Sequence, residues 1–228
     1  YGGLMALVQK DMKSLVAYSS VSHMGLIMLA LFSLNVEATE GALYQMLNHG
    51  LSTGALFLAV GVLYERTHTR LIADHGGLAA RMPVFAGFFL LVMLSSAGLP
   101  GLNGFVGEIL CFYGVFAADK LLAVLSVSTA VLSAAYLLWL YRRVMHGPVK
   151  VPGGATLRDL GLRELACFVP IVVLIFYMGL FPGTFLRKMD AAVSRHIETV
   201  TIKSRTAAVR PGPAPSGPVG AIPEGMER

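Results

Sequence analysis

Residues 83–117 read PVFAGFFLLVMLSSAGLPGLNGFVGEILCFYGVFA and carry one charge, that of Glu108. A straight membrane-spanning helix needs only about 20 apolar residues, and two antiparallel spans would need a polar loop between them. The central segment 98–104 (GLPGLNG) contains a proline, which lacks an N–H, and three glycines, which accept non-helical dihedral angles. We therefore predict one discontinuous span. Its helix stops and restarts at Leu99, Pro100, Gly101 and Gly104.

The break in this span has a chemical consequence. Backbone groups left unpaired at membrane depth persist only where protein or a wet cavity satisfies them, and in transporters such breaks adjoin the ion pathway. Glu108 follows the break by about one helical turn. An ionisable side chain at that depth is rare and marks a functional site by default. The alternative is a structural carboxylic acid that a buried partner neutralises.

The composition excludes a soluble globular domain. Of 228 residues, 55% are hydrophobic and 14% are charged, and the mean hydropathy is +0.68. The net charge of +5 arises at span ends and in the tail rather than in one patch, which indicates membrane orientation and no nucleic-acid partner. Cys111 and Cys167 lie inside apolar spans without CxxC spacing, so the sequence predicts neither a disulfide framework nor a metal site.

We predict an all-α polytopic membrane protein in three parts. Residues 1–13 form the end of a preceding helix and a cytoplasmic connector, residues 14–186 a membrane bundle, and residues 187–228 a polar tail that is disordered after about 210. Because the chain opens inside an apolar helix, we expect it to be the carboxyl-terminal portion of a longer protein. The five expected spans are 15–34, 42–64, 83–117 (broken at 98–104), 121–141 and 165–186.

The basic residues provide a test of the single discontinuous span. Connectors 9–13, 65–82 and 142–164 hold two, three and five Lys or Arg residues, whereas the other two connectors hold none and one. If 83–117 crosses once, the three basic connectors share one side, as the positive-inside rule requires. If it crossed twice, the connector with five would lie opposite the one with three. We predict one crossing, with the basic connectors cytoplasmic and the carboxyl terminus outside.

Polar residues in the first two spans lie on helix faces. In 42–64, Gln45, Asn48, His49, Ser52 and Thr53 fall at offsets 0, 3, 4, 7 and 8, which is one continuous stripe. In 15–34, Ser19 and His23 are four residues apart and share a face. The stripes fit either a proton path or tight helix packing through small polar residues. Span 121–141 is interpreted as an anchor, because it contains uncharged hydroxyls and ends in interfacial aromatic residues and arginines.

We predict a proton relay through Glu108, His49 and His23, each near the centre of its span. Burial disfavours the charged forms of carboxylates and imidazoles alike, which favours proton exchange near neutral pH. These sites are expected to be too far apart for direct transfer, so water must bridge them. The residues expected to hold this water are Ser19, Ser22, Asn48, Ser52 and Asn103.

No other chemistry is indicated by the motifs. The chain contains no nucleophile constellation, phosphate-binding loop or cofactor fingerprint. The connector 65–82 holds two histidines and an aspartate, but their spacing matches no zinc signature and the neighbouring arginines argue against a cation. We therefore predict no cofactor and no metal in this chain.

Three segments carry a family resemblance: QKDMKSLVAYSSVSHMG (9–25), YQMLNHGLSTGALFLAVGVLYERTHTR (44–70) and LSSAGLPGLNGFVGEILCFYG (94–114). They resemble subunit M of respiratory NADH:quinone oxidoreductase (complex I), chain 4 in mitochondrial naming. The resemblance covers roughly residues 1–146. The segment from HGLSTGALFL to LYERTHTR (49–70) favours subunit M over the related subunits L and N, which usually carry Lys where this chain has Glu108. Ser14 stands where the family usually has Arg, and the family's earlier Glu and Lys pair is missing.

The resemblance implies an antiporter-like helix bundle in the bacterial inner (cytoplasmic) membrane. It implies a proton-translocating membrane-arm subunit, coupled to electron transfer elsewhere, in which Glu108, His49 and His23 are relay members. The enzyme class is that of the translocase assembly, because this chain holds no catalytic redox site. Expected partners are the other complex I membrane subunits, especially L and N, and the lipid bilayer. NADH, FMN, iron–sulfur clusters and quinone are expected on partner subunits.

Two other functions stay open at this point. The first is a subunit of a multisubunit cation/proton antiporter, which is similar in fold and also lacks redox centres. The second is a purely structural membrane scaffold, for which replacing Glu108 by Gln would be silent.

Overall fold

The computed structural model describes residues 1–150 and 157–209, with side chains to residue 204. These residues are helical apart from their connectors, which contain two short 3-10 turns (Ile72–Asp74 and Leu78–Ala80). This confirms the predicted all-α membrane bundle. Four helices are long and apolar enough to span a membrane: α2 (Met12–Phe32), α3 (Val36–Thr67), α6 (Lys120–Met145) and α7 (Leu162–Leu180). The others are α1 (Gly2–Leu7), α4 (Pro83–Ser96), α5 (Asn103–Ala118) and α8 (Gly183–Val209).

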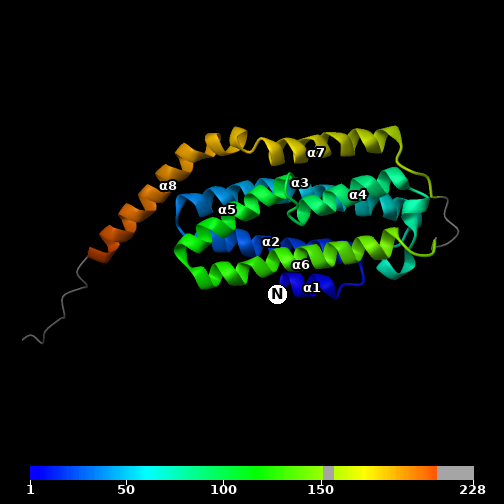
Figure 1. Ribbon diagram of the computed structural model, residues 1–228, viewed down its shortest axis with the longest axis horizontal. Helices are drawn as coiled ribbons and strands as arrows, with labels where there is room; N and C mark the ends of the chain where they lie inside the picture. The colour runs from blue at the N-terminus through cyan, green and yellow to red at the C-terminus, as the bar shows by residue number, and fades with distance from the viewer. Residues whose placement is uncertain (151–156, 210–228) are drawn as a thin grey trace, which may run out of the picture.

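Helices α4 and α5 form the discontinuous span. They lie end to end along α3, and together they extend from one end of the bundle to the other (Figure 1). The backbone between them turns at Gly98 (φ 75°) and Gly101 (φ 91°), in the left-handed region that glycine tolerates. The predicted break at 98–104 therefore lies at residues 97–102, with Gly104 already inside the first turn of α5.

The other helices differ from the expected spans at their ends. Helix α3 begins before residue 42 because the Asn35 side chain accepts a hydrogen bond from the Ala38 N–H (2.8 Å) and caps it. Helix α7 ends at Leu180 rather than 186, since Pro182 has no N–H to continue the helix. The Met178 carbonyl, which Pro182 leaves unpaired, accepts a hydrogen bond from the Tyr44 hydroxyl (2.7 Å). Helix α8 includes the first part of the predicted tail. The predicted disorder after about residue 210 falls on residues 210–228, which lie outside the described residues.

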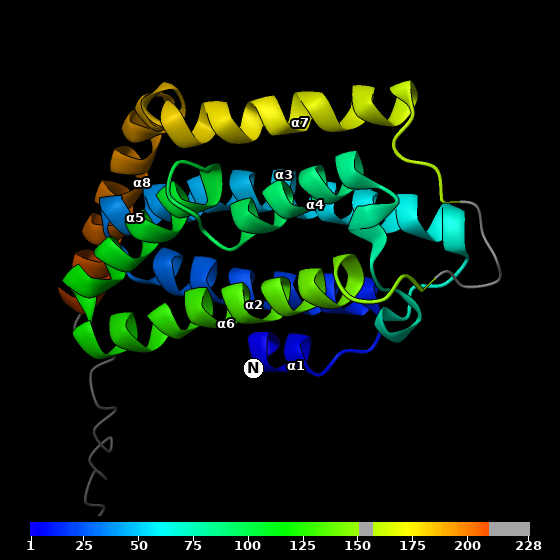
Figure 2. The same ribbon diagram turned by 45° about the vertical axis from the view of Figure 1, so that its right-hand side comes forward.

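The three basic connectors meet at one end of the bundle. Asp11 forms a β-bridge with Leu71, and Gly76 forms another with Lys150, which joins the α1–α2, α3–α4 and α6–α7 connectors. The α2–α3 and α5–α6 connections lie at the opposite end (Figures 1 and 2). The bundle therefore has one basic end, which is the arrangement that a single crossing of residues 83–117 requires.

His75, in the α3–α4 connector, is a buried structural residue. Its side chain is 2% exposed, and its Nδ1–H donates to the Leu71 carbonyl (2.9 Å). Burial lowers the pKa of His75, although this hydrogen bond and nearby Asp74 oppose the shift. Among the described residues, no group of three His, Cys, Asp or Glu side chains is arranged to hold a metal ion.

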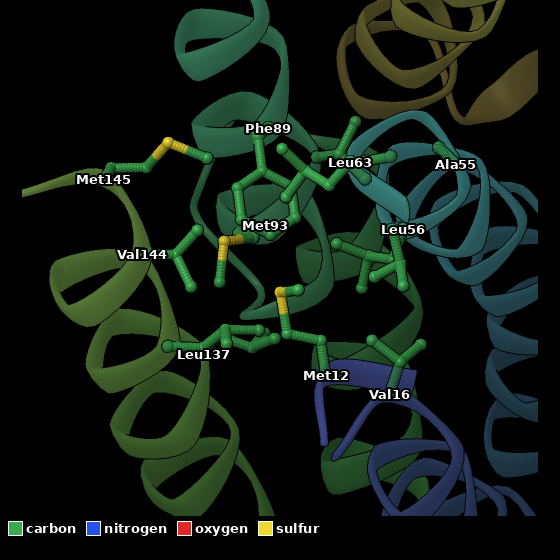
Figure 3. Close-up of a cluster of buried hydrophobic side chains, with 14 of the residues drawn as sticks. Met12, Val16, Ala55, Leu56, Leu63, Phe89, Met93, Leu137, Val144 and Met145 are labelled. Carbon is green, nitrogen blue, oxygen red and sulfur yellow. The ribbon is translucent and has the colours of Figure 1, made fainter. Parts of the chain in front are cut away.

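An apolar core fills the half of the bundle next to the basic end. Figure 3 shows side chains from α2, α3, α4 and α6 meeting there. In a bilayer such packing gains dispersion energy rather than hydrophobic free energy, because lipid tails are as apolar as the core. Labelled members are Met12, Val16, Ala55, Leu56, Leu63, Phe89, Met93, Leu137, Val144 and Met145.

Helices α3 and α5 approach each other through glycines. A Cβ atom at Gly41 would lie 2.6 Å from the Cys111 backbone nitrogen, and one at Gly114 would collide with the Ala38 backbone. Small residues at such positions let membrane helices pack backbone against backbone. This close packing holds the half-helix that carries Glu108 against the polar stripe of α3.

We expect Gly114→Ala to reduce the amount of assembled protein. The added methyl group meets backbone rather than a flexible side chain, and overpacking of this kind costs about 1–3 kcal/mol. Gly54→Ala is the matched control, because a Cβ atom at this position of α3 meets nothing within 4 Å. Assembly is measured by native gel and thermal stability in detergent. Equal stability of the two variants would contradict the packing argument.

Candidate functional site

The three relay candidates lie together in the middle of the bundle. His23 on α2 places its Nδ1 3.5 Å from Oε1 of Glu108 on α5. The imidazole rings of His23 and His49, which lies on α3, have centroids 5.2 Å apart. His23 is 3% exposed and Glu108 is 5% exposed. The expectation that no pair is close enough for direct transfer is therefore wrong for His23 and Glu108.

A closed ring of hydrogen bonds connects the helix break to α3. Ser95, at the end of α4, donates to Oδ1 of Asn103, the first residue of α5 (2.5 Å). The hydroxyls of Ser52 and Ser95 are 2.7 Å apart, and Asn103 Nδ2 reaches Ser52 Oγ at 3.5 Å. Asn48 Nδ2 also donates to the Asn103 carbonyl (2.8 Å). These contacts tie the end of α4 and the start of α5 to each other and to α3.

The backbone of the break forms one wall of the carboxylate site. A Cβ atom at Gly98 would collide with the Glu108 carboxylate, so only glycine allows this approach. Of the four predicted break residues, Leu99, Pro100 and Gly101 are exposed. Gly104 packs against the Ser95 carbonyl, beside the histidines.

A small polar cavity lies between the histidines and the break. Its volume is about 10 Å³, close to the space that one water molecule needs. Two of its polar atoms, Asn48 Oδ1 and Ser96 Oγ, are buried without a hydrogen-bond partner in the described part of the chain. Buried polar atoms of this kind are ordinarily satisfied by an ordered water. The lining residues are His23, Gln45, Asn48, His49, Ser52, Ser95, Ser96 and Gly104.

Two of the five supporting residues lie away from this cavity. Ser22 faces α1, since its Oγ would be 3.3 Å from a Cβ atom at Gly3. Ser19 donates its hydroxyl proton to the Val16 carbonyl (2.7 Å). Asn48, Ser52 and Asn103 lie at the break, as the ring of hydrogen bonds shows.

The sequence analysis did not single out Tyr136, because its helix, α6, was interpreted only as an anchor. Its side chain is completely buried, and its hydroxyl is 3.4 Å from His23 Nε2. A tyrosine in the middle of a span is itself a signal, because a buried phenol usually has a hydrogen-bond partner. Ser96 was missed because a serine in an apolar helix is unremarkable.

Comparison with known proteins adds independent findings. A family model described as "NADH:quinone oxidoreductase/Mrp antiporter, TM" matches residues 1–133. The chain is 44% identical over 198 residues to NADH-quinone oxidoreductase subunit M of Rhodobacter capsulatus, and 41% identical over 198 residues to NADH-ubiquinone oxidoreductase chain 4 of Marchantia polymorpha. Each alignment covers 87% of this chain but only 39% and 40% of the respective relative. The chain thus spans well under half the length of these relatives.

Solved structures show the same fold. A chain of respiratory complex I from Thermus thermophilus with bound NADH superposes with a TM-score of 0.81 at 37% identity, over 87% of this chain and 42% of that chain. A chain of the Mrp complex from Dietzia sp. DQ12-45-1b superposes with a TM-score of 0.80 at 20% identity, over 88% of this chain and 46% of that chain. At 20% identity the second comparison supports the fold alone.

Proposed function

Because this chain belongs to the NADH:quinone oxidoreductase/Mrp antiporter transmembrane family, we propose that it translocates protons as part of a respiratory NADH:quinone oxidoreductase. The identity of 44% to a subunit M supports this assignment over an antiporter of the Mrp type, whose structure matches at 20% identity. The activity proposed is that of a whole protein of the relatives' length, of which this chain covers about 40%.

The observation that carries the proposal is the buried pair of His23 and Glu108, 3.5 Å apart beside the helix break. Both groups exist in neutral and charged forms. Transfer of the Glu108 proton to His23 converts a neutral pair into an ion pair, and transfer back restores the neutral pair. A pair with these two states can take up a proton from one side and release it to the other when its surroundings change.

His49 extends the relay across the bundle. Its ring is next to that of His23, and the Thr53 hydroxyl lies 3.2 Å from its Nδ1. Both histidines line the polar cavity, which is also bordered by Asn48 and Ser96 with their unpartnered Oδ1 and Oγ atoms. We infer that a water held there connects His49 to the break, which gives the discontinuous helix a direct part in the proton path.

The assembly around this chain supplies the rest of the activity. We propose that NADH, FMN, iron–sulfur clusters and quinone are bound by partner subunits. The partners would be other membrane subunits of the complex, especially the antiporter-like L and N subunits. The basic end of the bundle would face the cytoplasm across the bacterial inner membrane, with the carboxyl terminus outside.

The test is purification of the full-length parent protein through an affinity tag in mild detergent. We expect it to copurify with a peripheral arm that oxidises NADH and, after reconstitution, to pump protons when NADH and a quinone are supplied. The competing antiporter function predicts no NADH oxidation and proton exchange driven by a sodium gradient instead. Copurification without an NADH-oxidising arm would refute the complex I assignment.

A further inference from the structure

A cavity of about 530 Å³ lies between α3 and α7, next to the basic end of the bundle. Helix α7 runs along the outer side of the bundle, and its first turns lie near the last turns of α3 (Figures 1 and 2). The volume falls within the range of about 300–1,000 Å³ that is usual for ligand pockets, and most of the cavity surface is apolar. The residues of the proposed proton relay are not among those that line it.

This cavity is charged at one end and apolar at the other. Its charged residues, Glu65, Arg163 and Glu164, lie in the last turn of α3 and the first turn of α7. At 1.5 Å per residue, Phe57 lies about 12 Å deeper along α3 than Glu65, and Phe168 about 8 Å deeper along α7 than Arg163. Both helices are long and apolar enough to span a membrane. The cavity therefore runs from the level of the lipid headgroups into the hydrocarbon.

The charges at the headgroup end leave one cation and one anion available. Arg66 of α3 and Glu164 form a bidentate ion pair, with two nitrogen–oxygen distances of 2.8 Å. The Arg66 guanidinium also donates to backbone carbonyls, and Glu164 also accepts from the Gly161 N–H (2.8 Å). The side chains of Glu65 and Arg163 are exposed, and in the described part of the chain neither forms an ion pair or a hydrogen bond.

We propose that this cavity binds phosphatidylethanolamine, with the lipid phosphate on Arg163, its ammonium group on Glu65 and an acyl chain against Phe57 and Phe168. Arginine matches the geometry of a phosphate, and a primary ammonium group offers three N–H donors to a carboxylate. Phosphatidylcholine has no N–H on its headgroup nitrogen. An anionic lipid such as phosphatidylglycerol would leave Glu65 without a cation. The headgroup that complements both side chains is therefore zwitterionic and carries a primary amine.

Two residues on the cavity wall make the proposal testable. Gly61 of α3 lines the cavity, and a Cβ atom added there meets nothing within 4 Å. A larger side chain at this position would therefore occupy the cavity without colliding with backbone. Cys167 of α7 also lines the cavity and is exposed, so the reactivity of its thiol reports whether the cavity is filled.

The first test measures alkylation of Cys167 by a maleimide in the full-length parent protein, purified with its accompanying subunits and stripped of lipid by detergent. Peptide mass spectrometry gives the rate, and buried Cys111 is the internal reference. Phosphatidylethanolamine, phosphatidylcholine or phosphatidylglycerol with identical acyl chains is then added. We expect phosphatidylethanolamine to slow alkylation of Cys167 about fivefold, and the other two lipids less than about twofold, because neither forms the ion pair with Glu65.

Substitutions at the headgroup end separate the two charge contacts. In Glu65→Gln, protection by phosphatidylethanolamine should fall to the level of phosphatidylcholine, because the carboxylate that selects the amine is gone. In Arg163→Gln, the weaker protection by phosphatidylcholine and phosphatidylglycerol should be lost as well, since all three lipids carry a phosphate. Glu37→Gln is the matched control, because Glu37 is an exposed carboxylate in the first turn of α3, at the opposite end of the helix. It should keep full protection.

Gly61→Leu tests where the acyl chain lies. We expect a phosphatidylethanolamine with a photoreactive diazirine in its acyl chain to label α7 several-fold less in this variant than in the parent. Gly87→Leu is the control, since a Cβ atom at this exposed position of α4 also meets nothing within 4 Å and Gly87 does not line the cavity. Equal labelling of α7 in the two variants would overturn the placement of the chain.

Three results of the alkylation test would overturn the proposal. Equal protection by the three lipids would show unspecific contact with lipid only. Strongest protection by phosphatidylglycerol would assign the cavity to an anionic lipid. If Cys167 stays unreactive after phosphate analysis shows that the lipids have been removed, another part of the protein or a neighbouring subunit covers the cavity.

Discussion

Proton pumping is expected to collapse when Glu108 is replaced by Gln, while the complex still assembles. The amide has the shape of the carboxyl group and fills the same space against Gly98, so packing is retained. It cannot release a proton to His23 Nδ1, the atom 3.5 Å away in the parent protein. Positioned acid–base groups typically contribute about 10²–10⁴-fold to a proton-transfer step, so we expect a decrease of at least about 100-fold.

The measurement is NADH-driven acidification of inverted membrane vesicles together with NADH:quinone turnover, with assembly followed by native gel. Glu37→Gln is the control, since Glu37 is an exposed carboxylate in the first turn of α3, away from the relay. If Glu108→Gln pumps as well as Glu37→Gln, then Glu108 is a structural acid and the relay is wrong for this chain. If the Glu108→Gln complex does not assemble, the Glu108→Asp variant, which keeps a carboxylic acid, is measured instead. Proton pumping that persists in Glu108→Asp would support the relay.

A methyl group at Gly98 is expected to impair pumping much more than the same group at Gly101. Both glycines have positive φ angles, 75° and 91°, so alanine pays a similar backbone strain of about 1–2 kcal/mol at each. They differ in what the methyl group meets. At Gly98 it collides with the Glu108 carboxylate, whereas at Gly101 it meets nothing within 4 Å. The Gly98→Ala variant must therefore move Glu108 away from His23 or open the break.

Comparison of the two variants separates strain from displacement. We expect Gly101→Ala to lower thermal stability by a few degrees with near-normal pumping per assembled complex. Gly98→Ala should lose at least about 10-fold in pumping per assembled complex, because a displacement near 1 Å in such a site can cost about 100-fold. Equal pumping in the two variants would show that the contact between Gly98 and Glu108 does not matter.

Local chemistry explains why the fold was predictable from the sequence. The break follows from Pro100 and the glycines around it, because a missing N–H and a missing Cβ atom act wherever the residue stands. The number of crossings followed from the distribution of Lys and Arg, which depends on the membrane rather than on packing. Helix ends were predicted less well. Asn35 caps α3, and Tyr44 satisfies the carbonyl that Pro182 leaves unpaired in α7, through bonds that are invisible in a hydrophobicity pattern.

The candidate site was predicted in part. Charge at membrane depth singled out Glu108, His23 and His49, since burial of an ionisable group is costly whatever its neighbours are. Their roles as relay members stay predictions. Ser22 was expected to hold water because it has a hydroxyl in the same span as His23. Adjacent residues of a helix face different directions, however, and Ser22 faces α1. Tyr136 was left out because no charge marked it.

The sequence by itself determined the membrane class, the discontinuous span and the ionisable residues inside it, because these depend on the covalent properties of single residues and on the free energy of placing them in lipid. Only the tertiary structure decided that His23 meets Glu108 directly, that Asn48 and Ser96 border one small cavity, and that the Tyr136 hydroxyl contacts His23 Nε2. These contacts join helices far apart in the chain. They depend on the rotation and spacing of each helix, which the glycine contacts between α3 and α5 help to set and no local pattern encodes.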